Sequence, residues 1–129
     1  MLNNKNDCKD METDFSDMIG VPYRDGGRDL SGFDCYGAVI EAAKRRGKTL
    51  RDVRYKNHAP ELADENAPTL NVEKINAPEK DALIEMIFNG ELHIGFCIDE
   101  KTFLHATKNQ GVRISRIGVI PVKNFYRIK

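Results

Sequence analysis

The segment Gly32-Phe33-Asp34-Cys35-Tyr36-Gly37 decides the fold, because it joins a glycine-rich loop to the start of a helix. From Asp34 onward, small apolar residues recur at helical spacing, which is typical of a helix packed closely against a sheet. Three basic residues then precede Gly47, and this combination marks a helix end. The pattern predicts a helix from Asp34 to about Arg46, with Cys35 in its first turn.

Residues 10–19 predict an earlier helix, preceded by a polar and flexible tail at 1–9. Four large apolar side chains recur there at helical spacing, and Gly20 provides a stop. These side chains are Met11, Phe15, Met18 and Ile19.

The segment between this helix and Cys35 contains a proline and adjacent glycines, so it predicts a structured loop. Residues 48–78 are polar and contain three prolines, which predicts a long loop with a short helix near 60–65. A connection of this length in a small domain is often functional.

The second half of the chain is strand-like, and Asn89-Gly90 between two apolar runs is a strong hairpin signal. Helices first and antiparallel strands second predict an α+β fold, with helices packed on a central sheet in one domain at 10–129. The predicted strands are 83–88, 92–98, 102–107, 112–117 and a last one at 124–128.

Composition excludes several classes of function. Among 129 residues, 20 basic side chains balance 20 acidic ones, so no general attraction to nucleic acid is expected. The chain has no apolar run that resembles a signal peptide or a membrane span, so we expect a cytoplasmic or phage-associated protein. Three widely spaced cysteines form neither a disulfide framework nor a structural zinc site.

Cys35 is the candidate nucleophile. A thiolate is the reactive form of cysteine, and a helix N-terminus lowers the thiol pKa from its usual value near 8.5. We therefore expect the pKa of Cys35 to be depressed, and an adjacent imidazolium would depress it further.

His93 is the candidate base. Alternation along 92–98 places His93, Gly95 and Cys97 on one face of a strand and the larger apolar residues on the other. We expect the apolar face to be buried behind the sheet, so that the His93 face looks toward Cys35 and Gly95 leaves room beside the ring.

Whether His105 lies beside His93 depends on the length of the hairpin loop between their two strands. A two-residue loop, Glu100-Lys101, would put His93 and His105 on opposite faces. A three-residue loop, Asp99-Glu100-Lys101, pairs Gly95 with His105. The histidines then share a face as diagonal neighbours, with Cα atoms about 7–8 Å apart.

These residues divide by chemistry into a nucleophile, Cys35, a general base, His93, and an orienting residue, His105. A metal site from the same three side chains is the alternative, but it lacks a carboxylate or second cysteine at a recognisable spacing. No metal or other cofactor is expected. We expect Cys97 to pack in the core, and we expect no chemical role for Cys8 or His58.

Taken together, these segments resemble the NlpC/P60 family of papain-like cysteine peptidases over about residues 10–117. Besides Gly32 to Gly37, the similar stretches are Gly20 to Gly27, Leu92 to Ile98, Phe103 to Ala106 and Gly111-Val112. The resemblance implies a papain-like fold, and hydrolysis of amide bonds in bacterial peptidoglycan stem peptides through an acyl-enzyme.

The resemblance also implies catalytic roles for Cys35, His93 and His105, and substrate-binding or oxyanion-supporting roles for Tyr23 and Asp34. Tyr36 stands where the family often has serine, and we expect it to narrow the cleft. The Arg-Asp-Gly-Gly run at 24–27 is similar to phage tail-associated members, so phage tail or other delivery proteins are expected partners beside the peptidoglycan substrate.

Two other functions stay open. The same triad could act on an amide or ester outside the cell wall, because fold does not determine substrate. Alternatively, the chain could be a non-catalytic component of a phage tail or secretion assembly that retains the fold.

Overall fold

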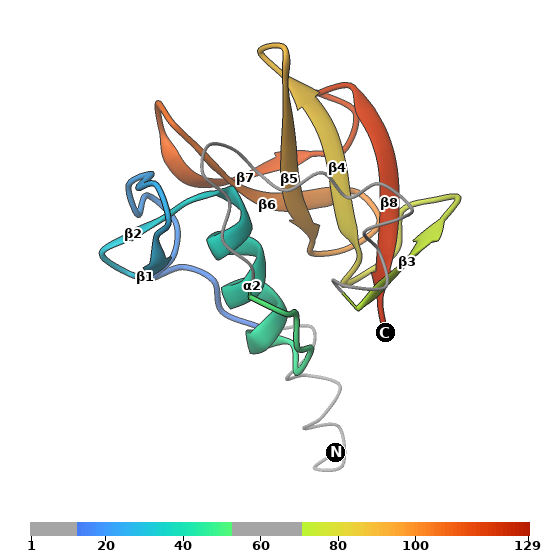
Figure 1. The fold of residues 1–129 in the computed structure, drawn as a ribbon, viewed down its shortest axis with the longest axis horizontal. Coiled ribbons are helices and arrows are strands. Elements are labelled where there is room, and N and C mark those ends of the chain that lie inside the picture. Colours follow the sequence, from blue (N-terminus) through green and yellow to red (C-terminus); the bar gives the residue numbers. More distant parts are fainter. Residues whose placement is uncertain (1–12, 53–70) are drawn as a thin grey trace.

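The computed structural model describes residues 13–52 and 71–129, which form a helix against an antiparallel sheet (Figure 1). The six-stranded sheet has the order β3-β8-β4-β5-β6-β7, and a separate two-stranded ribbon pairs β1 with β2. The elements are β1 (Arg28–Asp29), β2 (Gly32–Phe33), α2 (Cys35–Arg45), β3 (Val72–Ile75), β4 (Leu83–Phe88), β5 (Glu91–Cys97), β6 (Thr102–Thr107), β7 (Gly111–Arg116) and β8 (Val122–Ile128).

Helix α2 confirms the prediction from the Asp34–Arg46 pattern. Asp34 is its N-cap, and its carboxylate accepts a hydrogen bond from the Gly37 N–H at 2.6 Å. This bond satisfies one of the free amides at the start of a helix. Lys44 and Arg45 occupy the last turn, where positive charge suits the helix dipole.

The helix predicted over residues 10–19 is wrong for its described part, because residues 16–20 form turns. The amides of Met18 and Ile19 bond to carbonyls three residues earlier, at 2.9 and 3.3 Å. Phe15 and Met18 are buried as predicted, but Ile19 is exposed. The tail at 1–9 and the short helix near 60–65 lie outside the described residues.

The five predicted strands are confirmed within about two residues at each end. Asn89 and Gly90 both have positive φ and form the two-residue turn between the paired residues Phe88 and Glu91. Strand β3 lies inside the predicted loop 48–78 and was missed. It is a four-residue edge strand paired with β8, too short for a clear alternation signal.

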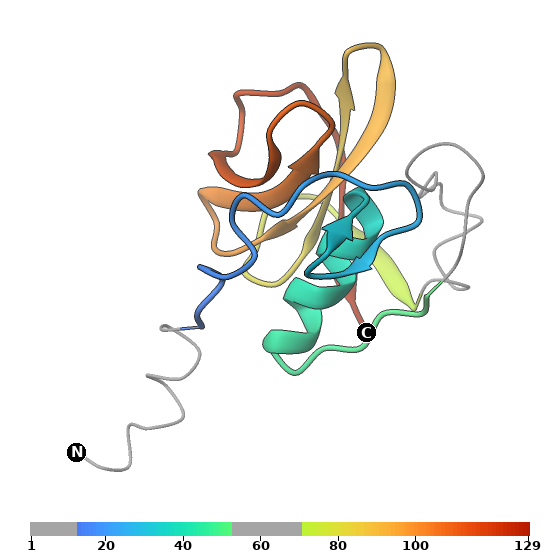
Figure 2. The same cartoon turned by 90° about the vertical axis from the view of Figure 1, so that its left-hand side faces the viewer.

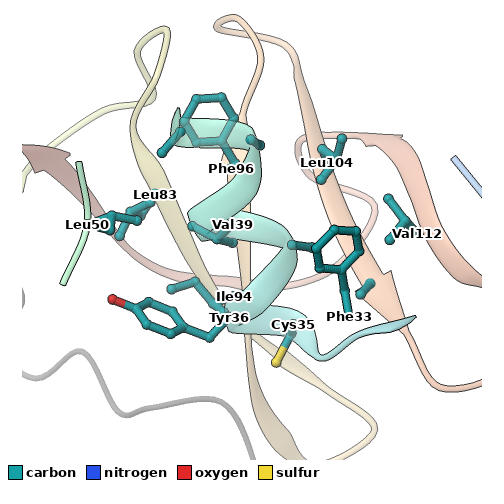
Figure 3. Close-up of a cluster of buried hydrophobic side chains, with 14 of the residues drawn as sticks. Phe33, Cys35, Tyr36, Val39, Leu50, Leu83, Ile94, Phe96, Leu104 and Val112 are labelled. Atoms are coloured by element: carbon teal, nitrogen blue, oxygen red, sulfur yellow. The ribbon is translucent and has the colours of Figure 1, made fainter. Parts of the chain in front are cut away.

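The main core lies between α2 and one face of the sheet (Figures 1 and 2). Small α2 residues allow the helix to pack closely on the large strand residues, and Figure 3 shows Val39 of the helix in one cluster with Leu83, Ile94 and Phe96 of the strands. A second apolar cluster, which includes Cys97 and Phe103, involves the alternate strand residues. The fold is therefore α+β, with a sheet buried on parts of both faces.

Gly37 is required by a close backbone contact at the start of α2. A Cβ atom at this position would lie 2.0 Å from the carbonyl oxygen of Gly27. The loop before the helix therefore lies directly on its first turn, and this contact helps to fix the position of Cys35.

Within residues 13–52 and 71–129, no helix has both the length and the apolar character needed to span a membrane.

Candidate active site

A cavity of about 500 Å³ lies where α2, the β4–β5 hairpin and strands β6 and β7 meet. Of the six residues predicted for the site, four line this cavity: Tyr23, Cys35, His93 and His105. A cavity with several converging polar side chains is the expected setting for a ligand or substrate.

Cys35 enters the cavity from the first turn of α2. Its thiol is free, and the residue is only 4% exposed. Figure 3 places the sulfur at the edge of the apolar cluster, pointing away from Val39 and Phe96. The backbone N–H of Ile94 on β5 favours the thiolate form of this sulfur and so lowers its pKa. Helix α2 and strand β5 therefore meet directly at the candidate nucleophile.

The expected depression of the Cys35 pKa is wrong for the resting protein. Burial and the negative charge of Asp34 raise the pKa of Cys35 to about 12, although nearby backbone N–H groups favour the thiolate. Two effects outweigh the helix N-terminus: the sulfur is desolvated, and the capping carboxylate occupies the same helix end.

His93 and His105 form a hydrogen-bonded pair. Phe96 pairs with Leu104 and Cys97 with Phe103, which is the register predicted for the three-residue loop Asp99 to Lys101. The Asp99 carboxylate closes that loop by accepting bonds from the N–H groups of Lys101 and Thr102, both at 2.8 Å. The Nε2 atom of His93 then lies 2.8 Å from Nδ1 of His105.

The predicted orientation of β5 is wrong. Its apolar residues Ile94 and Phe96 lie in the same core as α2, rather than behind the sheet. His93 alternates with them, yet it lines the same cavity as Cys35. The β5–β6 pairing covers two residue pairs, and in Figure 1 the strands diverge beyond them. This divergence allows residues from both faces of the sheet to reach one cavity.

Gly95 was expected to leave room beside the His93 ring, but among the described residues the side chain nearest to it is that of Phe103. A Cβ atom there would lie 2.8 Å from the Phe103 ring, so the glycine makes room for Phe103. That ring stacks at a tilt on His105, with ring centres 4.6 Å apart, while Phe88 contacts His93 at 5.2 Å. The two imidazoles are therefore held between aromatic side chains.

Burial keeps both histidines neutral. It lowers the pKa of His93 to about 4. Burial together with the positive charges of His93 and Arg113 lowers the pKa of His105 to about 3. At neutral pH the site thus holds a thiol and two uncharged imidazoles. Any thiolate at Cys35 would therefore have to be formed by proton transfer within the site.

Several polar residues that line the cavity were not predicted from the sequence, among them Ser115, Arg113 and Lys108. Ser115 on β7 has its Oγ 2.9 Å from Nε2 of His105. Arg113 is the cross-strand partner of His105, and Lys108 lies above the Tyr23 ring. Strand alternation alone does not show that Ser115 and Arg113 lie on the same face as His105. That placement also requires the β6–β7 register, and a one-residue change in the turn would move both side chains to the other face.

Asp34 and Tyr36 are not among the residues that line the cavity. Asp34 accepts bonds from Arg28 at 2.7 Å and from the Gly26 N–H at 3.2 Å, in addition to capping α2. Tyr36 is buried, and its hydroxyl donates to the Arg51 carbonyl at 2.6 Å. The structure therefore places both in supporting positions, and the expected narrowing of the cleft by Tyr36 does not occur.

Comparison with known proteins identifies the family. The NlpC/P60 family model matches residues 20–127. The chain belongs to the NlpC/P60 family. This assignment confirms the resemblance seen in the sequence and agrees with the papain-like α+β fold. No curated protein matches the chain significantly.

Three solved structures share the fold. The NlpC/p60 domain of the peptidoglycan hydrolase SagA has a TM-score of 0.59 and 18% identity, covering 87% of this chain and 90% of that domain. A lipoprotein-like NLP/P60 protein from Staphylococcus aureus subsp. aureus Mu50 has a TM-score of 0.64 and 17% identity, with coverages of 97% and 42%. An NlpC/P60 protein from Bacillus cereus ATCC 10987 has a TM-score of 0.58 and 19% identity, with coverages of 85% and 36%. The chain thus spans less than half the length of the latter two.

The depressed histidine pKa values predict loss of stability in mild acid. The unfolded chain binds protons near pH 6.5, whereas folded His93 and His105 bind them only near pH 4 and 3. Their stabilising contribution is therefore present above pH 6.5 and is lost as the pH falls. Each histidine contributes a slope of up to about 1.4 kcal/mol per pH unit. Urea unfolding between pH 7 and 5 measures this slope.

His105→Gln is the matched control, because glutamine fills similar space without titrating in this range. Its unfolding free energy should depend less steeply on pH than that of the wild type. An equal slope in the two proteins would contradict the assignment.

Proposed function

We propose that the protein hydrolyses amide bonds in peptidoglycan stem peptides, with Cys35 as nucleophile, His93 as base and His105 as orienting residue. The observation that carries this proposal is one cavity lined by all three side chains, two of them joined by a 2.8 Å imidazole–imidazole hydrogen bond. Family membership supports the peptidase class, and one structural neighbour is named a peptidoglycan hydrolase.

In the proposed acylation step, His93 takes the proton from the Cys35 thiol while the sulfur attacks the substrate carbonyl carbon. The imidazolium then gives this proton to the departing amine, and the C–N bond breaks to leave a thioester on Cys35. A water molecule, deprotonated by His93, attacks the thioester. The acid product leaves and the proton returns to the sulfur, so the site ends as it began.

The neutral resting site suits this sequence of steps. Because the thiol and the imidazole are both uncharged before substrate binds, separated charge develops only during the reaction. The backbone N–H groups of Cys35, Tyr36 and Ile94, which favour the thiolate, are the donors we propose for a developing oxyanion, where preorganised donors contribute most.

Tyr23 is proposed as a substrate-binding or oxyanion-supporting donor. It lines the cavity, and burial together with the negative charge of a Cys35 thiolate raises the pKa of its hydroxyl. The hydroxyl therefore stays protonated and able to donate when negative charge develops nearby.

In the described part of the chain, the charged residues that line the cavity are two cations, Arg113 and Lys108, and one carboxylate, Glu91, so the balance of charge favours a substrate that carries carboxylates. Arg113 lines the cavity beside His105. Lys108 lies 4.0 Å from Glu91, an exposed pair with little mutual stabilisation. Stem peptides contain free carboxylates, so this charge pattern agrees with the proposed substrate. An amide outside the cell wall is the alternative, and a panel of muropeptides and unrelated amides separates the two.

A non-catalytic role is the second candidate, favoured by one specific observation. Cys35 is almost fully buried, and its pKa is raised rather than lowered. An assembly component that kept the fold without the reaction would share these properties. Partners such as phage tail proteins belong to this candidate.

Cys35→Ala tests the reaction. We expect the wild-type protein to cleave a purified muropeptide and the variant to lose at least about 10³-fold in rate, because Cys35 is the one cysteine among the described residues that line the cavity. Cleavage is followed by mass spectrometry of the products. Cys97→Ala is the matched control and should keep its activity, because Cys97 lies in the second apolar cluster and does not line the cavity. Wild-type rates in Cys35→Ala would refute the mechanism.

Alkylation separates the enzyme from the non-catalytic candidate without knowledge of the substrate. With iodoacetamide near pH 7.5, we expect peptide mapping to find Cys35 labelled in the wild type. In His93→Gln the rate should fall at least about tenfold, because the base that removes the thiol proton is missing. Labelling of Cys35 that is absent, or equal in both proteins, would favour the non-catalytic role.

A further inference from the structure

We propose that Ser115 is a positioning residue that selects the reactive tautomers of both histidines. The inference rests on the proposed function and extends the His93–His105 pair by one member. It starts from the second ring nitrogen of His105, which the triad roles leave unassigned. This atom, Nε2, lies 2.9 Å from the Ser115 hydroxyl oxygen.

Strand pairing places Ser115 beside His105. Ser115 lies opposite Phe103, and His105 lies opposite Arg113, so all four residues occupy the same face of the β6–β7 ladder. Among the described residues, the Ser115 side chain has no other hydrogen bond to a side chain, and it lines the cavity. Its proton can therefore point to the cavity while its lone pair faces His105.

The reaction determines the direction of each hydrogen bond. Nε2 of His93 is engaged with His105, so Nδ1 is the atom left to accept the Cys35 proton. A neutral imidazole carries one proton, so His93 must carry it on Nε2 and donate it to Nδ1 of His105. Nδ1 of His105 then has no proton, and Nε2 of His105 carries one. That N–H donates to the Ser115 oxygen.

The opposite arrangement is unreactive. If His105 carried its proton on Nδ1, it would donate to Nε2 of His93. The proton of His93 would then lie on the Nδ1 atom of His93, which is the atom that must accept the Cys35 proton. Both directions preserve the His93–His105 contact, so this contact alone does not select one. A hydroxyl can either donate to Nε2 of His105 or accept from it, so Ser115 selects the reactive direction when its own proton points into the cavity and its oxygen accepts from Nε2–H.

The same bond supports the charge formed during the reaction. When His93 accepts the proton, positive charge is shared along its bond to His105, which is 2% exposed. Arg113 opposes positive charge on His105. An oxygen that accepts from Nε2–H partly offsets this repulsion without a buried carboxylate, whose desolvation would itself be costly.

Nuclear magnetic resonance of protein labelled with ¹⁵N-histidine tests the tautomers directly, since protonated and unprotonated ring nitrogens differ in chemical shift. The chain has three histidines, so His58→Gln assigns the remaining signals to the pair. We expect substrate-free protein at pH 7 to carry both protons of the pair on Nε2. A proton on Nδ1 of His105 would overturn the proposal, whether or not the protein cleaves any peptide.

Ser115→Thr and Ser115→Val form a matched pair for function, because they differ by a hydroxyl but have nearly the same shape. Threonine should preserve the tautomers and kcat. Valine should give a mixture of tautomers and lower kcat by about tenfold or more, with little change in KM; in serine triads a fully wrong tautomer costs roughly 10⁴-fold. Equal kcat values and equal nitrogen shifts in the two variants would refute the role of Ser115.

If no peptide is cleaved, the rate of Cys35 alkylation replaces kcat. If both protons lie on Nε2 in the wild type and Cys35 is alkylated more slowly in Ser115→Val, the positioning role of Ser115 is supported even though the proposed substrate is refuted. The two proposals can therefore fail separately.

Discussion

The register of the β5–β6 hairpin is the constraint on which the candidate site depends. Because successive strand residues face opposite sides, a slip of one residue would turn one histidine away from the other. The three-residue loop closed by Asp99 prevents this slip, and the ring contact between His93 and His105 follows from it. Cys35 is brought to the same cavity independently, by the loop that lies on the first turn of α2.

Burial then determines the chemistry of the site. The same apolar surroundings that hold the side chains in place make charge costly, so Cys35 and both histidines are neutral at rest. Asp34 adds to this effect because it caps the helix beside the sulfur and is itself bonded to Arg28. In the proposed reaction, such a site would act by general-base catalysis within the bound complex and not through a preformed thiolate.

Local sequence patterns predicted the strands and helix α2, because each depends on short-range periodicity. They made the contact between His93 and His105 depend on the length of one turn, and the structure has the three-residue loop that allows it. They failed where a long-range contact decides the outcome. The face of β5 that meets α2, the buried position of Tyr36 and the edge strand β3 all depend on which elements become neighbours. Ser115 was missed for the same reason, since its contact with His105 requires the register of a second hairpin.

A double-substitution cycle on the imidazole pair tests the central claim most directly. The hydrolysis rate is measured for wild type, His93→Gln, His105→Gln and the double variant. If His105 acts only through His93, the double variant should be no slower than His93→Gln alone, because residues that work as a unit have non-additive effects. Losses that multiply in the double variant would show independent roles and contradict the proposed Cys35–His93–His105 unit.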